Sequence, residues 1–107
     1  MRIAKRMNGP AQVSNAAADK YTVASGRRGI LRHVHVQNPS GSPVTFTMSI
    51  GADAAGTRLF DAFSIAANQV IDHYCYYVLE AAEKIQALAG TNNVLVLTID
   101  GDEEVLS

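Results

Sequence analysis

Residues 70–100 constrain the fold of this chain more than any other stretch. Three runs rich in Val, Ile, Leu and Tyr, which are typical of β-strands, follow one another there: 74–79, Lys84–Ala89 and 94–99. Short polar or glycine-containing links, AAE and GTNN, separate them. This spacing predicts three antiparallel strands arranged as a meander.

Both faces of the first and last of these runs are apolar. Because side chains alternate across a strand, Leu95, Leu97 and Ile99 lie on one face of the last run and Val94 and Val96 on the other. The same alternation places apolar side chains on both faces of the first run. A two-layer sandwich covers only one face of each sheet. We therefore expect other copies of the chain to cover part of the second face, which predicts a homo-oligomer.

The remaining sequence indicates further short strands between turn signals, the densest of which is NPSGSP at residues 38–43. No segment has helical periodicity over a dozen residues. The predicted fold class is all-β, a single antiparallel β-sandwich of jelly-roll or Ig-like type with about eight strands, spanning residues 19–107. The predicted additional strands are 20–23, 28–37, Val44–Ile50, 58–60, 63–65 and 69–73.

The first eighteen residues are predicted to form an extended N-terminal arm. They are rich in Ala, Ser and Asn and lack a periodic apolar pattern. Ile3 and Met7 are spaced to anchor in a groove, with Arg2, Lys5 and Arg6 beside them for an acidic partner. We expect this arm to become ordered on a particle or a neighbouring subunit. A solvated terminus without function is the alternative.

Composition excludes several classes of protein. The chain has 107 residues and a net charge of −1, but residues 1–35 carry about +6 and residues 36–107 about −7. This polarity reflects solvated faces or steers a basic segment onto an acidic partner. Cys75 is the single cysteine, so no intrachain disulfide forms. We expect neither an export signal nor a membrane span, because the longest apolar run has six residues.

His33 and His35 are two apart on a predicted strand, an arrangement that occurs in zinc and copper sites, with His73 as a conceivable third ligand. Ordinary surface histidines explain the same spacing, and we expect no metal and no cofactor. Cys75 with His73 and Asp72 resembles a nucleophile with a base and an orienting acid. However, Asp72 points away from His73 on a strand, and Cys75 lies in the most apolar run. We therefore expect no catalytic residues and no enzyme.

Two binding functions, for nucleic acid and for sugars, would use the basic and aromatic residues of this chain. Recognition of single-stranded nucleic acid adds aromatic platforms to basic residues, and only Tyr21 lies near the basic run, so no nucleic-acid partner is expected. Tyr74, Tyr76 and Tyr77 are predicted to be core and interface aromatics that bind a partner. A sugar-stacking platform is the alternative for these tyrosines.

Two segments together resemble small β-sandwich accessory proteins of tailed bacteriophage virions: YTVASGRRGILRHVHVQNPSGSPVTFTMSIG and DAFSIAANQVIDHYCYYVLEAAEKIQALAGTNNVLVLTIDGDEE. The elements that match are Asn38, the turn at 40–42, EKIQA at 83–87, and Gly101. Ala82 departs from the pattern, which usually has glycine there, so the turn at that point is expected to differ.

The resemblance implies a non-enzymatic virion structural protein, assembled in the host cytoplasm, that decorates the exterior of a capsid. Its implied partners are further copies of itself, as a trimer, and other virion proteins such as the major capsid protein. A tail or tail-tip protein and a carbohydrate- or receptor-binding module remain as alternatives.

Overall fold

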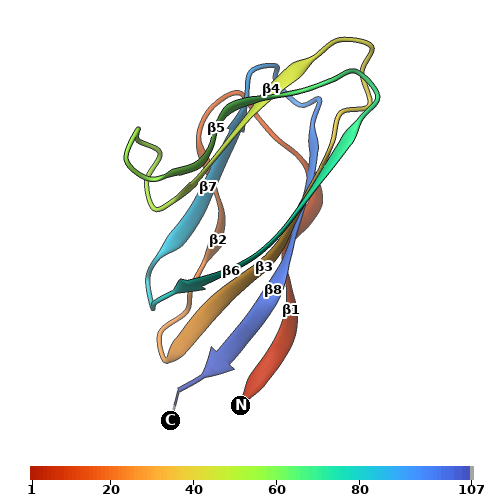
Figure 1. Ribbon diagram of the computed structural model, residues 1–107. Coiled ribbons are helices and arrows are strands. Elements are labelled where there is room, and N and C mark those ends of the chain that lie inside the picture. Colours follow the sequence, from red (N-terminus) through yellow and green to blue (C-terminus); the bar gives the residue numbers. More distant parts are fainter. Residues whose placement is uncertain (107) are drawn as a thin grey trace.

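Two four-stranded antiparallel sheets pack face to face in the computed structural model, which describes residues 1–106 (Figure 1). This arrangement confirms the predicted all-β sandwich. Within the described residues, no helix is long and apolar enough to cross a membrane. The strands are β1 (Arg2–Gln12), β2 (Ala18–Thr22), β3 (Arg27–Gln37), β4 (Val44–Ile50), β5 (Arg58–Ile65), β6 (Val70–Leu79), β7 (Lys84–Ala89) and β8 (Val96–Val105).

The strand order identifies a jelly roll rather than an Ig-like sandwich. One sheet has the order β1-β8-β3-β6 and the other β2-β7-β4-β5. The first strand therefore pairs with the last, the second with the seventh, the third with the sixth and the fourth with the fifth. This is the pattern of one long hairpin rolled into two sheets.

The meander predicted for the C-terminal half is wrong. β6 and β8 belong to one sheet, whereas β7, which lies between them in the sequence, belongs to the other. In the rolled hairpin, each of these short links crosses from one sheet to the other instead of joining neighbours. Link length alone does not distinguish a crossing link from a hairpin.

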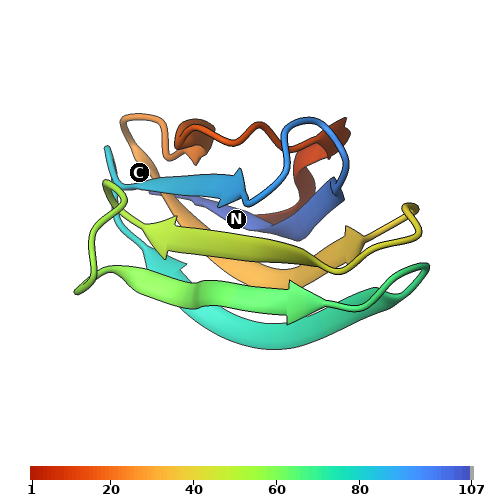
Figure 2. The same cartoon turned by 90° about the horizontal axis from the view of Figure 1, so that it is seen from above.

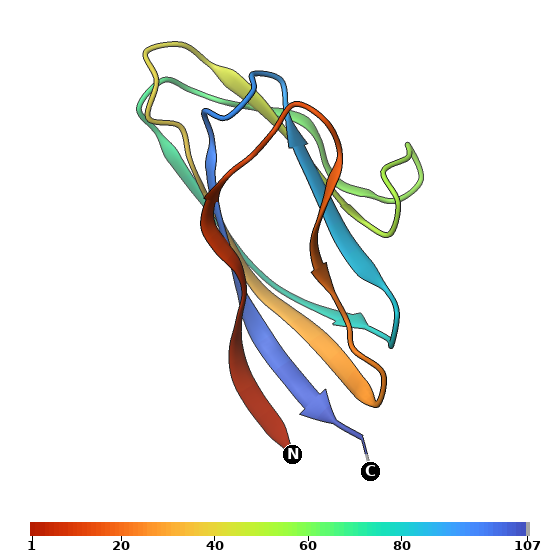
Figure 3. The same ribbon diagram turned by 180° about the vertical axis from the view of Figure 1, so that it is seen from behind.

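The predicted arm over residues 1–18 is also corrected, because most of it is strand. β1 pairs antiparallel with β8 from Arg2, opposite Glu104, to Gln12, opposite Val96 (Figure 3). Backbone hydrogen bonds hold this segment, and they need no apolar periodicity. Sequence periodicity therefore could not detect it. β2 then begins at Ala18.

A register shift in β3 interrupts the regular alternation of its two faces. The pairing of β3 with both of its neighbours shifts between Leu31 and His33. As a result Leu31 packs in the core together with Val34 and Val36, while Ile30 is buried outside the core cluster. Strict alternation along β3 would instead place Ile30 on the same face as Val34 and Val36. A β-bulge of this kind re-aims side chains and cannot be read from a strict period of two.

The two sheets form two layers (Figure 2), and the core between them is built from alternating inward residues of both. In β4, Val44, Phe46 and Met48 are buried, and so are the polar side chains of Thr47 and Ser49. In β8 and just before it, Leu95, Leu97 and Ile99 are fully buried, whereas Val94 and Val96 are half-buried. The largest fully buried side chains are Phe46, Ile30, Leu31, Met48, Ile65, Leu79, Ile85, Leu95, Leu97, Ile99, Val13 and Val23.

The turn between β6 and β7 keeps a glycine-like backbone although it lacks the glycine. Ala82 has φ of 71°, in the left-handed region that favours glycine, and its N–H donates to the carbonyl oxygen of Val23 at 3.0 Å. The expectation that this turn would differ because alanine replaces glycine is therefore not supported by its backbone. Alanine adopts the conformation at a cost of about 1–2 kcal/mol.

Candidate assembly surface

β6 exposes more large apolar side chains than any other strand of the described chain. Its exposed residues include Tyr74, which is 76% exposed, and Tyr76, which is 56% exposed. Elsewhere such residues occur singly, as with Phe63 on β5. The full set on β6 is Val70, Tyr74, Tyr76, Tyr77 and Val78. Apolar side chains gathered in this way mark a surface that contacts another molecule.

β6 is also the least protected of the four edge strands. β1 carries Lys5 and Pro10 and has two register shifts, and β2 has only five residues. β5 has two register shifts and a left-handed residue, Ala62. Charges, proline, bulges and shortness are the features that keep sheet edges from pairing with other chains. β6 is ten residues long, contains no Lys, Arg or Pro, has Asp72 as its single acidic residue, and has one register shift, in its pairing with β3.

The two most exposed tyrosines are held in place by contacts along the sheet. Tyr74 stacks on the ring of His33, with centroids 4.4 Å apart and planes 4° apart. The Tyr76 hydroxyl accepts a hydrogen bond from Arg2 Nη2 at 3.1 Å, and Arg32 Cζ lies 5.5 Å from the centre of its ring. These contacts order the aromatic rings before any partner binds, which lowers the entropy cost of binding.

Ion pairs cover the rest of the outer face of this sheet. Arg6 Nε lies 3.1 Å from Asp100 Oδ1, and Arg32 Nη1 lies 3.2 Å from Asp102 Oδ2. Exposed pairs of this kind contribute only about 0–1 kcal/mol each. Their main effect is that the basic residues of the N-terminal segment are already neutralised by acidic residues of β8. Part of the charge difference between residues 1–35 and residues 36–107 is therefore neutralised within one chain.

Some of the residues that were predicted to bind a partner are exposed on the surface, and others make contacts within the chain. Arg2, Tyr74 and Tyr76 come together on the outer face, and Tyr77 and Ile3 are exposed. Met7 is only 7% exposed and belongs to the core, so its predicted role as a docking anchor is wrong. Its burial follows from the register shift in β1 between Arg6 and Asn8. Lys5 lies 3.6 Å from Glu103 in an internal ion pair.

Glu103 is the buried centre of a polar cluster at one end of the sandwich. The hydroxyl of Tyr21 donates to Glu103 Oε2 at 2.6 Å, and Arg27 Nη1 donates to Oε1 at 3.0 Å. The hydrogen bond from Tyr21, with the nearby charges of Lys5 and Arg27, holds the pKa of Glu103 below its usual value despite burial. Burial and the carboxylate of Glu103 in turn raise the pKa of Tyr21.

Replacing Glu103 with glutamine is expected to lower the free energy of unfolding at neutral pH by about 2–3 kcal/mol, because Arg27 loses its buried counter-charge. The folded-state pKa of Glu103 lies below the usual value of 4.5, so its contribution is complete above pH 4.5 and is lost as the pH falls through the folded pKa. Urea unfolding between neutral pH and acid should therefore show a smaller loss of stability in Glu103→Gln than in the wild type.

Glu80→Gln is the control for this measurement. Glu80 pairs with Arg28 at 3.2 Å, but its side chain is 58% exposed, so its loss should cost less than about 1 kcal/mol. Equal effects of the two substitutions would contradict the role assigned to Glu103.

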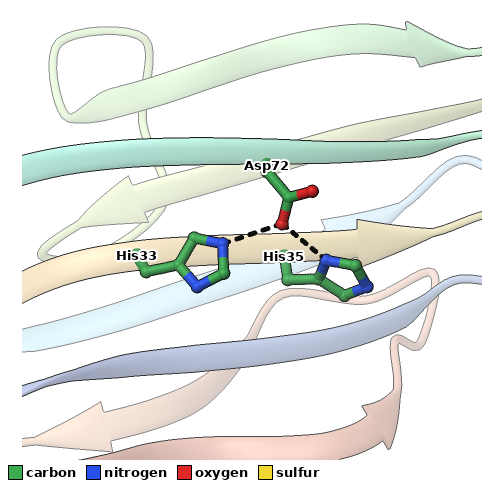
Figure 4. A group of neighbouring side chains, drawn as sticks. All are labelled: His33, His35 and Asp72. Atoms are coloured by element: carbon green, nitrogen blue, oxygen red, sulfur yellow. Dashed lines mark hydrogen bonds and ion pairs between the residues drawn. The ribbon is translucent and has the colours of Figure 1, made fainter.

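The histidines form a cluster with a partner that sequence reasoning missed. His33 Nε2 lies 2.8 Å and His35 Nδ1 2.7 Å from the same oxygen of Asp72 (Figure 4). These hydrogen bonds, first from His35 and then from His33, lower the pKa of Asp72. His73, the third ligand considered from sequence, packs edge-on against Phe60 with centroids 5.2 Å apart. The i, i+2 spacing identified His33 and His35, but the pairing of β3 with β6 was required to find Asp72.

Cys75 lies on β6, the strand that carries Asp72, and its side chain is half-buried. Its thiol donates to the carbonyl oxygen of Leu31 at 3.6 Å, and burial raises its pKa. A thiol held in the protonated form is a poor nucleophile. The geometry therefore places Cys75 among the packing residues, beside the core.

Comparisons with known proteins relate the chain to assembly proteins by fold. No family model matches the sequence, and no curated protein matches it. A solved Bacillus endospore appendage protein, from a family described as disulfide-linked pili, has a TM-score of 0.60 at 13% identity, covering 100% of this chain and 90% of the other. The coat protein of Tobacco streak virus, solved as a dimer, has a TM-score of 0.57 at 12% identity, covering 99% and 86%.

A protein of the T13 IBDV viral particle has a TM-score of 0.55 at 8% identity, covering 96% of this chain and 30% of the other. At these identities the likenesses establish the fold alone. The class that they define is a jelly-roll β-sandwich of a kind that occurs in viral coat proteins and in a pilus protein.

Proposed function

We propose that the chain is a non-enzymatic structural protein of a virion, a capsid decoration protein that binds the exterior of the particle as a homotrimer. The observation that carries the proposal is the β6 edge, which is long, apolar and less protected than the other three edges. The jelly-roll fold and the sequence resemblance to virion accessory proteins support the particle as its location.

The contact between subunits is proposed to use β6 and the tyrosines beside it. An exposed edge strand offers backbone N–H and C=O groups to a second chain, and ordered aromatic rings supply apolar area next to those groups. Tyr76 is held between Arg2 and Arg32, so it presents its ring without further ordering. The backbone gives affinity, and the tyrosines give the contact its register.

Val78→Lys is expected to convert the protein from an oligomer to a monomer. Val78 is 48% exposed on β6, and a lysine there would place a charge on the proposed contact, as natural edge strands do. Light scattering on wild-type protein should give about three times the mass of one 11.4 kDa chain, and on the variant the mass of one chain. Phe63→Lys is the matched control, since Phe63 is 47% exposed but lies on β5, and it should remain oligomeric.

A wild-type mass near 11.4 kDa at micromolar concentration would refute the proposed oligomer. If the oligomer survives in Val78→Lys but dissociates in Phe63→Lys, the contact between subunits lies on β5, in the other sheet. Circular dichroism should show that both variants keep the wild-type fold, because both positions face solvent.

Placement on the particle is tested separately with gold-labelled antibody against the chain on intact particles from cultures that express its gene. Label over the head shell supports decoration, and label confined to the tail supports the alternative of a tail or tail-tip protein. Particles without label would overturn the proposed location.

A carbohydrate- or receptor-binding module is the second candidate, and the exposure of Tyr74 favours it. Aromatic faces that are open to solvent can stack on sugar rings, and Tyr74 is 76% exposed. However, one face of this ring is already stacked on His33. Binding to a glycan array that is lost in Tyr74→Ser would support this candidate.

A further inference from the structure

We propose that His33, His35 and Asp72 form a binding site for a divalent transition-metal ion such as zinc on the outer face of the β1-β8-β3-β6 sheet. The inference stands on the geometry of this cluster and is independent of the proposed role in a virion. Within the described residues, these three side chains place one ligand atom each within 4.8 Å of one another.

Strand geometry brings the three ligands together. His33 and His35 both project outward from β3, two residues apart, and His35 lies directly opposite Asp72 in the pairing of β3 with β6. Two imidazoles and one carboxylate are the ligand set of several zinc sites that leave a fourth position open. Three ligands from two adjacent, hydrogen-bonded strands form a rigid site, which lowers the entropy cost of binding an ion.

The observed distances require only a small adjustment for an ion. With metal–ligand bonds of about 2.0–2.2 Å, ligand atoms in a tetrahedral site lie about 3.3 Å apart. The two histidine nitrogens lie 2.7 and 2.8 Å from Asp72 Oδ1. A rotation of the Asp72 side chain, which is 39% exposed, opens this space. The ion would replace the ring protons that His33 and His35 now direct at the carboxylate.

Supporting contacts fix the orientation of His33. Its Nε2 faces Asp72, while its Nδ1 lies 3.9 Å from Asp100 Oδ2 on the neighbouring strand. Metal-binding histidines usually present their second nitrogen to a carboxylate, directly or through water. Tyr74 stacks on the same imidazole and limits its rotation. The side chain of His33 is only 22% exposed, so the ring is well supported.

The open position faces solvent. The side chain of His35 is 36% exposed, and β6, which carries Asp72, is an edge strand. Water, or a donor atom from another molecule, can therefore complete the coordination. An open position of this kind makes the site suited to bridging as well as to simple binding of the ion.

The test is calorimetric titration of the full chain with zinc chloride. Wild-type protein is expected to bind one zinc ion per chain, and His35→Gln and Asp72→Asn should each weaken binding by more than about tenfold. His73→Gln is the matched control, because it removes the remaining histidine but leaves the cluster intact, and it should bind zinc as the wild type does. Cobalt should give a visible absorption band in the wild type that Asp72→Asn lacks.

Two results would overturn the inference. The first is the absence of zinc binding with a dissociation constant below about 100 μM in the wild type. The second is equal binding by the wild type and His35→Gln. In either case the cluster is a hydrogen-bonded group of Asp72 and two histidines and nothing more. All three side chains are partly solvent-exposed, so these variants are expected to fold, which circular dichroism checks.

Discussion

Replacing Gly101 with alanine is expected to lower the free energy of unfolding by about 3–5 kcal/mol or to prevent folding. A Cβ atom at this position would lie 2.1 Å from the carbonyl oxygen of Ile30 and 2.7 Å from Met7 Cε. The methionine can move, but the carbonyl belongs to the backbone of β3, which pairs with β8 at this point. The two strands must separate to admit the methyl group, and their hydrogen bonds are lost.

Thermal and urea unfolding of Gly101→Ala and Gly41→Ala measure this effect. Gly41 is the matched control, since a Cβ there would meet no heavy atom within 4 Å and its φ is not positive. Its substitution should change stability by less than about 0.5 kcal/mol. A Gly101→Ala protein that melts with the wild type would show that the two strands can move apart at little cost.

Replacing Asn38 with alanine is expected to cost about 3–4 kcal/mol. Its side chain is fully buried, and its amide nitrogen donates to the carbonyl oxygens of Ser42, Ile65 and Ala66 at 2.9, 3.0 and 3.3 Å. Its Oδ1 accepts from the backbone N–H of Ser40 at 3.1 Å. One side chain thus joins the loop after β3 to the end of β5, and alanine leaves these buried groups without partners.

Asn92→Ala is the control for Asn38. Asn92 is exposed and accepts one hydrogen bond, from the backbone of Asn15 at 3.1 Å, so its loss should cost no more than about 1 kcal/mol. Asn38→Asp should be at least as harmful as Asn38→Ala, because a carboxylate cannot donate to three carbonyl oxygens. Unfolding by urea at neutral pH compares the four proteins, and similar midpoints for Asn38→Ala and Asn92→Ala would contradict the assigned role.

Local patterns in the sequence were sufficient to predict most of the strands, although not β1, and they did not predict how the strands connect. The strand predicted over Val44–Ile50 and the burial predicted for the apolar run at 94–99 are both found, although Thr47 and Ser49, on the alternate positions of β4, are buried as well. The placement of β6, β7 and β8 in alternate sheets depends on the whole rolled hairpin. No single link carries that information.

The resemblance to virion accessory proteins singled out Asn38 and Gly101, and the structure explains both as fold-determining residues. Asn38 forms buried hydrogen bonds with backbone carbonyl groups, and Gly101 permits the close approach of two strands. Residues of this kind identify a fold family and say little about binding. The candidate surface was predicted in part, through Tyr74 and Tyr76. Met7 was misplaced because a register shift in β1 turns it into the core.

Asp72 illustrates why the histidine cluster was beyond sequence reasoning. Its contacts with His33 and His35 depend on the register of β3 against β6, which in turn depends on the shift between Leu31 and His33. A register error of one residue would turn Asp72 to the opposite face of its strand. Periodicity within one strand cannot supply that relation.

The position of β8 has a consequence for how the protein is made. β8 is the eighth strand along the chain, yet it lies between β1 and β3 in the finished sheet. Neither β1 nor one side of β3 has its final neighbour until β8 has been made, so a nascent chain that lacks β8 has open strand edges. Both termini finish at the same end of the sandwich, where the N–H of Val105 donates to the carbonyl oxygen of Met1 at 2.8 Å (Figure 1). Synthesis of β8 therefore controls when the first sheet closes, and a chain that is truncated before β8 cannot complete that sheet.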